Sequence, residues 1–77
     1  MPRPGERYTH DGIVVEIVEV VEYKTFGGRR CYLIGYKIRD GNYESPVAHF
    51  WCDVNANIAE EIKKVVEFYK QVRDVIR

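Results

Sequence analysis

Cationic and aromatic side chains gather around one glycine pair, and this group is the most chemically suggestive part of the sequence. Gly27-Gly28 predicts a chain reversal, and the side chains around it are Lys24, Phe26, Arg29 and Arg30. Cations attract phosphates and aromatic rings stack on bases, so the combination is typical of single-stranded nucleic-acid binding. The alternative is a solvated hairpin end whose arginines pair with Glu22 or Asp40.

Two tyrosines add to the candidate binding residues. Tyr36 and Tyr43 belong to a set of aromatic residues that could line a pocket for a cation or a flat base, and the set also contains Tyr32, Phe50 and Trp51. The alternative is a core role, which is common for aromatic rows on strands.

The residues that could bind a metal or perform catalysis form no recognisable motif. His10, Cys31, His49 and Cys52 include no C-x-x-C or H-x-x-x-H pair, the spacings that make a zinc assignment specific. His49 and Cys52 are three positions apart in an expected strand, so they project from opposite faces and cannot act as a base and thiol pair. We therefore expect no metal, no cofactor and no enzymatic activity.

Length and charge exclude several classes of protein. The 77 residues suffice for one small domain, and 12 Lys and Arg against 12 Asp and Glu give no net charge. A general electrostatic nucleic-acid binder is therefore not expected, whereas a local patch is not excluded. The two cysteines are too few for a disulfide framework, and the start MPRPGERY resembles no signal peptide. The longest apolar run, 13–21, is interrupted by Glu16 and Glu19 and is too short for a membrane span.

These features predict a cytoplasmic location and no membrane contact. The abundance of Val, Ile, Glu, Arg and Tyr beside one Gln and one Ser also resembles the composition of proteins from thermophiles.

The pattern of side chains predicts three antiparallel strands after a short lead-in over residues 1–12. The first, 13–24, is rich in β-branched residues, and its alternation requires a bulge near Ile17-Val18 to keep Glu19 out of the core. A helix is the alternative for this stretch, because glutamates recur every three residues. The second strand, 30–40, alternates cleanly, and the third covers 47–52.

A long amphipathic helix follows. Asn57 is expected to cap it, with Glu60 at the third helical position as in a capping box. Its apolar seam, spaced by threes and fours, is Ile58, Ile62, Val65, Tyr69, Val72 and Ile76. The fold class is therefore α+β, one β-β-β-α domain over 13–77 in which the helix packs on a bulged, barrel-like sheet.

The apolar residues exceed what one helix on one sheet face can bury. Either the sheet curls around its second face, or a second copy packs through a surface that includes Phe68, Tyr69, Val72 and Val75. The alternative is ordinary scattered exposure. We expect a homo-oligomer.

Three stretches resemble a chromodomain. VVEIV at 14–18 is similar to that family's first-strand phrase, and Gly28 with Cys31-Tyr32-Leu33-Ile34-x-Tyr36 is similar to its second strand. Trp51, Asn57-Ile58 and the helix residues 62–69 resemble its tryptophan segment and closing helix. The resemblance implies a curved three-stranded sheet with a C-terminal helix and a binding module of the chromo or SH3-like kind. Tyr36 is the counterpart of one residue of the family's aromatic cage.

Together these patterns predict a non-catalytic binding module, homodimeric, for nucleic acid or a nucleic-acid-associated protein. The 24–30 hairpin, with Tyr36 and Tyr43, would make the contact. The alternative is a structural or adaptor protein that self-assembles or binds a protein partner through its apolar helix and sheet surface.

Overall fold

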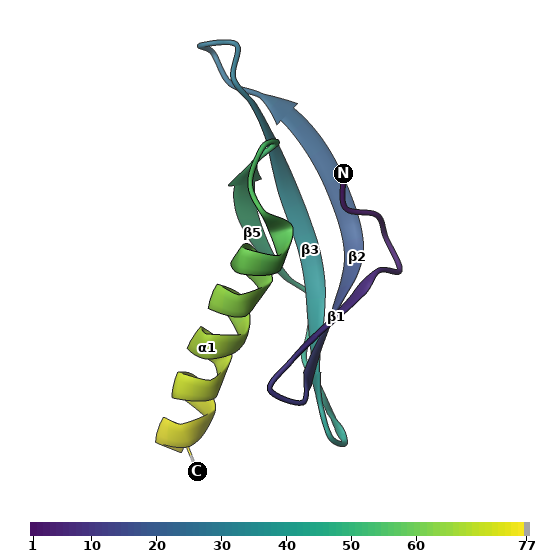
Figure 1. Cartoon of the computed structure of the whole chain (residues 1–77), viewed down its shortest axis with the longest axis vertical. Coiled ribbons are helices and arrows are strands. Elements are labelled where there is room, and N and C mark those ends of the chain that lie inside the picture. Colours follow the sequence, from purple (N-terminus) through teal and green to yellow (C-terminus); the bar gives the residue numbers. More distant parts are fainter. Residues whose placement is uncertain (77) are drawn as a thin grey trace.

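The computed structural model describes residues 1–76 and confirms the α+β class, an antiparallel sheet followed by one long C-terminal helix (Figure 1). Its elements are β1 (Arg7–His10), β2 (Ile13–Lys24), β3 (Arg30–Asp40), β4 (Tyr43–Glu44), β5 (Ala48–Asp53) and α1 (Ile58–Ile76). The long β2–β3 hairpin is the spine of the sheet. Strand β1 pairs with the start of β2, and β5 and β4 pair with successive parts of β3. Residue 77 lies outside the described residues.

Strand β2 contains the expected bulge, and the alternative of a helix here is wrong. Ile17 pairs with Tyr36 and Glu19 pairs with Gly35, so Val18 is the extra residue. The bulge reverses the phase of the strand: beyond it Val20, rather than Glu19, packs against the core. The β-branched residues thus form a strand that is buried on the same side along most of its length.

Strands β1 and β4 are absent from the sequence prediction, which places residues 1–12 in a lead-in. Asp11 and Gly12 both have positive φ, 52° and 77°, as a two-residue type I′ hairpin requires. Asp-Gly is a favoured sequence for such a turn, but the residues before it, RYTH, have too little apolar alternation to indicate a strand. Strand β4 has only two residues, too few to give any pattern.

The residues before β1 extend the same edge of the sheet. The Gly5 N–H donates to the Ile17 carbonyl at 2.7 Å, and the Ile17 N–H donates to the Glu6 carbonyl at 2.9 Å. These bonds satisfy the backbone of β2 next to its bulge.

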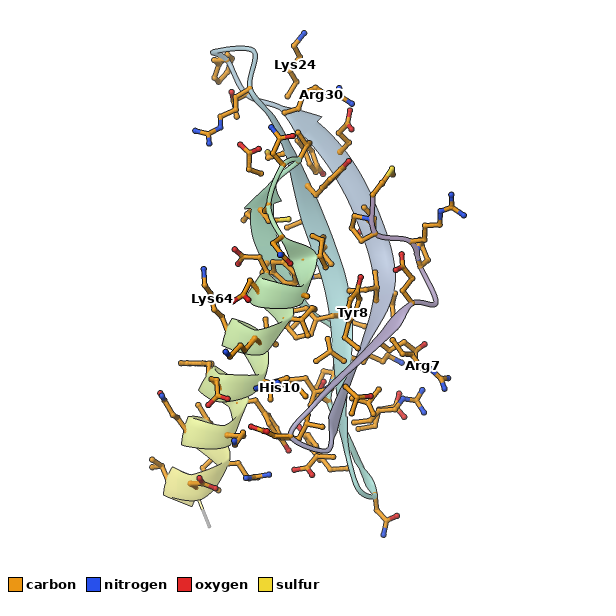
Figure 2. All side chains as sticks on the ribbon, in the orientation of Figure 1. Arg7, Tyr8, His10, Lys24, Arg30 and Lys64 are labelled. Carbon is orange, nitrogen blue, oxygen red and sulfur yellow. The ribbon has the colours of Figure 1, made fainter. Side chains whose placement is uncertain are left out.

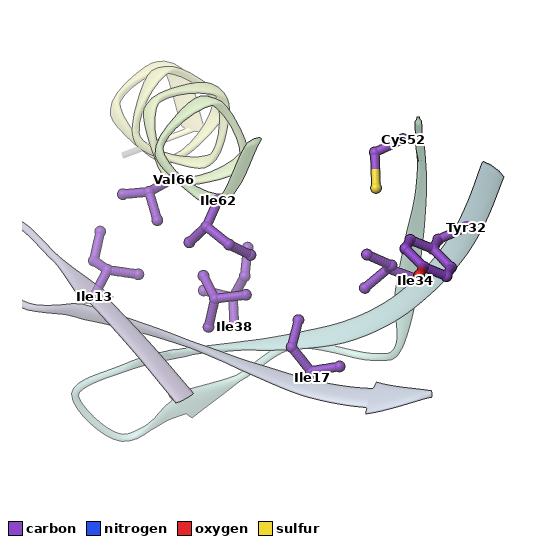
Figure 3. Close-up of a cluster of buried hydrophobic side chains, with 9 residues drawn as sticks. Ile13, Ile17, Tyr32, Ile34, Ile38, Cys52, Ile62 and Val66 are labelled. Carbon is purple, nitrogen blue, oxygen red and sulfur yellow. The ribbon is translucent and has the colours of Figure 1, made fainter. Parts of the chain in front are cut away.

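One helix on one sheet face encloses the core, as Figure 3 shows. The helix begins as expected, because Asn57 Oδ1 accepts a hydrogen bond from the Glu60 N–H at 3.2 Å. The buried side chains come from both layers: Ile13, Val15, Ile17, Tyr32, Ile34, Ile38 and Cys52 from the sheet, and Ile62 and Val66 from α1.

The expected apolar seam of α1 is wrong at its C-terminal end. Val72 and Ile76 are exposed, because the helix diverges from the strands there (Figure 1). Polar bridges hold this end instead. The Tyr69 hydroxyl donates to Asp40 Oδ2 at 2.8 Å, and Arg73 Nη1 donates to the same oxygen at 3.2 Å.

The difference between the two sides of α1 predicts a difference in stability. Val66 is 0% exposed and Val75 is 84% exposed on the same helix. Val66→Ala should reduce the free energy of unfolding by about 2 kcal/mol through lost apolar burial and a residual cavity. Val75→Ala is the matched control and should change it by less than about 0.5 kcal/mol. Urea denaturation at low micromolar protein concentration measures both, and equal losses would contradict this packing.

Candidate nucleic-acid interface

The sheet face turned away from α1 is solvent-exposed and carries apolar and aromatic side chains. Strand alternation and register place Val21, Leu33 and Trp51 in one cross-strand row there, because their neighbours Val20 and Ile34 face the core. We call this side of the sheet the open face.

An aromatic pair dominates the open face. Tyr23, two residue pairs further along the β2–β3 hairpin, contacts Trp51 edge to face, with ring centroids 5.3 Å apart and planes at 60°. About half of each side chain is exposed. The T-shaped contact fixes the two rings against each other while leaving ring surface available to a ligand.

The hairpin tip brings together Lys24, Phe26, Arg29 and Arg30, the four residues that the sequence predicts there. The turn closes with the Gly28 N–H donating to the Thr25 carbonyl at 2.9 Å, and Gly28 has φ 81°. Phe26 is fully exposed at the end of the turn. Figure 2 shows Lys24 and Arg30 near this end of the molecule.

Both arginines of the tip are paired with carboxylates. Arg30 donates through Nε and Nη2 to Glu22 at 3.1 and 2.7 Å, which is one of the predicted pairings. Arg29 Nε donates to Asp53 Oδ2 at 2.6 Å, rather than to Glu22 or Asp40. Among residues 1–76, Lys24 makes no ion pair. The tip therefore has one unpaired cation and two that a phosphate would have to share with or take from a carboxylate.

Asp53 anchors Arg29 and is itself held ionised. The Asn55 N–H donates to Asp53 Oδ1 at 3.0 Å, and this bond, followed by the pairing with Arg29, lowers the pKa of Asp53. A hollow of about 610 Å³ lies beside this pair, lined by Gly28, Arg29, Arg30, Asp53, Val54, Asn55 and Ala56. The hollow lies between the hairpin tip and the loop that leads into α1.

The structure does not bring Tyr36 and Tyr43 to the tip. Tyr36 points to the core side and packs against Phe50 with ring centroids 5.6 Å apart, and burial raises the pKa of its hydroxyl. Tyr43, in β4, stacks on Tyr69 at 6.2 Å, at the far end of β3. Neither tyrosine lies next to the hairpin tip, because β3 separates the tip at its start from β4 at its end.

A second cationic group lies on the open face, and the sequence prediction misses it. Arg7, Lys37 and Arg39 surround Glu16, with Arg39 Nη2 3.1 Å and Arg7 Nε 3.7 Å from Glu16 Oε1. Lys37 Nζ pairs with Glu44 at 3.2 Å. Figure 2 shows Arg7 on the side of the sheet away from the helix. The group cannot be recognised without strand β1, because the pairing of β1 with β2 brings Arg7 opposite Glu16.

Residues with metal-ligating atoms meet at one place in the described chain, where the β1–β2 turn meets α1. His10 Nε2 lies 3.1 Å from Glu67 Oε1 and 3.5 Å from Asp11 Oδ2. The Lys70 ammonium donates to the same Asp11 oxygen at 2.7 Å and lowers the pKa of that carboxyl. The cluster thus fastens the turn to the helix by hydrogen bonds and charge. As predicted, His49 and Cys52 lie on opposite faces: Cys52 is in the core, and His49 covers Gly35 on the open face.

Comparison of the chain with protein-family models, curated proteins and solved structures found no match. The resemblance to chromodomains therefore remains a prediction from the sequence. In the part of the chain that the structure describes, no helix is both long and apolar enough to cross a bilayer.

The pairing of Asp53 with Arg29 predicts a pH dependence. Asp53→Asn should lower the urea midpoint of unfolding at neutral pH, because an amide oxygen still accepts from Asn55 but the charge is lost. The folded-state pKa of Asp53 lies below its ordinary value of 3.8, so its carboxylate stabilises the fold above that value. The stabilisation is lost as the pH falls through the folded-state pKa. The gap between the two proteins should close there, and a gap that persists at lower pH would rule out a role for the charge.

Proposed function

We propose that this protein is a non-catalytic binding module for single-stranded nucleic acid, which lies on the open face and reaches the hairpin tip. The observation that carries the proposal is the half-exposed Tyr23–Trp51 pair next to a cationic hairpin tip. Exposed rings on a sheet beside cations are what single strands use, because their bases are free to stack.

Stacking must supply most of the affinity. The chain has no net charge, and the arginines of the tip already have carboxylate partners. A base that covers Trp51, Tyr23 or Phe26 gains on the order of 1–3 kcal/mol by stacking, irrespective of its identity. The module therefore favours unpaired bases and shows little preference for sequence.

Phosphate contacts make a smaller contribution that depends on salt. Lys24 is available directly, and Arg29 and Arg30 are exposed enough to turn a donor toward a phosphate while keeping a carboxylate partner. Each phosphate neutralised on a single strand contributes about −0.7 to the slope of log K against log salt. Two or three such contacts give a slope of about −2 or shallower.

A second group of cations, Arg7, Lys37 and Arg39, lies at the opposite end of the open face and extends the proposed binding surface. Three cations share two carboxylates there, Glu16 and Glu44, so this end carries a small excess of positive charge. A strand that stacks on Trp51 could place its backbone along β3 toward this group.

The proposal predicts quenching of the single tryptophan, Trp51, by a short oligothymidylate at low salt. Arg29→Glu combined with Arg30→Glu should weaken binding by about tenfold or more, because repulsion replaces attraction at the tip. Trp51→Ala should weaken it by about 5- to 100-fold, measured by anisotropy of a labelled oligonucleotide.

Lys63→Glu combined with Lys64→Glu is the matched control, since it makes the same change of charge on the exposed side of α1. It should leave the affinity nearly unchanged. Absence of quenching at low salt would overturn the proposal. So would equal weakening by the control pair, or equal affinity for a duplex, because either result means general attraction of charge without stacking.

A further inference from the structure

The C-terminal half of α1 carries an apolar surface that the fold leaves uncovered. Phe68, Val75 and Ile76 are 67%, 84% and 79% exposed, and Val72 lies among them. Tyr43 and Tyr69, stacked on each other, continue this surface onto the end of the sheet. We call these six residues the end patch. Tyr69 also packs against the edge of the core, and the other five residues lie outside both the core and the open face.

The end patch contains a projecting side chain and a groove. Phe68 projects from α1, and a groove of about 380 Å³ is lined by Tyr43, Tyr69, Val72, Arg73 and Ile76. At about 100° per residue, Phe68 and Ile76 are separated by about 80° around the helix, and Val72 lies halfway between them. A two-fold axis through the helix surface near Val72 would therefore bring Phe68 of each copy to the groove of the other.

Charge and area are compatible with a second copy. Among the described residues, the one charged residue lining the groove is Arg73, and Asp40 and Asp74 compensate it at 3.2 Å each, so the groove presents no unpaired charge to a second copy. The exposed parts of the end patch amount to roughly 500 Å² per protomer, so a pair would bury about 1,000 Å², the lower limit for a specific interface. Such an area corresponds to a weak, concentration-dependent dimer.

We propose that the protein forms a two-fold symmetric dimer through the end patch, with Phe68 of each protomer seated in the groove beside Tyr69 of its partner. Val72, near the proposed axis, and Val66 are about 120° apart around α1, so the partner approaches the flank of the helix and not its core side. The two helices meet at the interface, and each sheet lies on the far side of its own helix. Both open faces then point away from the interface. The dimer does not depend on the proposed nucleic-acid function, but it would make that function bivalent.

Sedimentation equilibrium of the full chain over a range of concentrations tests the dimer. The mass should rise from 9.1 kDa toward twice that value across the micromolar range. Phe68→Glu should raise the dissociation constant by about tenfold or more, whereas Phe26→Glu, the same substitution at another exposed Phe, should leave it unchanged. A monomer throughout, or a dimer insensitive to Phe68→Glu, overturns the proposal. Circular dichroism establishes that both variants fold.

Cysteine cross-linking tests the symmetry. Val72 and Val47 are 41% and 47% exposed, and Val47 precedes the free edge of β5. In a Cys31→Ser background, Val72→Cys should form a disulfide-linked dimer on mild oxidation, because a residue near a two-fold axis meets its own copy. Val47→Cys should not. Preferential linkage through Val47 would mean that copies join edge to edge and would overturn the end-patch dimer.

Different variants test the dimer and the nucleic-acid proposal, so one proposal can be overturned without the other. Phe68→Glu should preserve the quenching of Trp51 by oligothymidylate for each protomer, and the Arg29→Glu, Arg30→Glu pair should preserve the mass. Loss of both properties in either variant would contradict the separation of the two surfaces.

Discussion

The structure depends on a single constraint: one helix has to cover a sheet that has apolar side chains on both faces. The β2–β3 hairpin extends beyond the start of α1, and the helix diverges from the strands at its own C-terminal end. The core accordingly occupies the middle of one face. Two apolar regions are left outside it, the open face around Trp51 and the end patch around Phe68. Burial of apolar area favours covering both regions, which is why each is a candidate for binding.

The bulge at Val18 decides which side chains the open face presents. With an uninterrupted alternation, the side that carries Ile13 and Ile17 would continue with Glu19 and Tyr23, and a carboxylate would be forced into the core. The extra residue turns Glu19 outward and brings Tyr23 to the same face as Trp51. The aromatic pair is therefore a consequence of the same irregularity that keeps the core apolar. A strict period of two along the strand would place both Glu19 and Tyr23 on the wrong face.

The sequence predicts the elements with strong local patterns and fails where long-range contacts decide. β-branched residues, the glycine pair and the Asn57 cap act over a few positions, so β2, β3 and the start of α1 were predicted correctly. Strand β1 exists because Asp11-Gly12 folds it back onto β2, and four mainly polar residues cannot signal this. The prediction that the C-terminal end of the helical seam is buried was wrong for a related reason. Periodicity shows which side of a helix is apolar, but not where the helix diverges from the sheet that covers it.

The same limit applies to the candidate site. Lys24, Phe26, Arg29 and Arg30 lie together because a hairpin turn is local, whereas Tyr36 and Tyr43, the other predicted binding residues, lie away from them. Only the register shows that Tyr36 faces the helix side and that Tyr43 lies at the other end of β3. The partner of Arg29 is also non-local, since Asp53 reaches the tip through the pairing of β5 with β3.

This ion pair has a structural effect beyond the hairpin tip. Arg29 is tied to Asp53, and the Asp53 carboxylate also accepts from the Asn55 N–H at the start of the loop that leads into α1. The tip is thereby linked to the segment that begins the helix. In the proposed binding mode, a phosphate that drew Arg29 away would release one side of this link and leave the Asn55 bond to Asp53 intact. The proposed exchange of partners at the tip would therefore keep one hydrogen bond between Asp53 and the loop before α1.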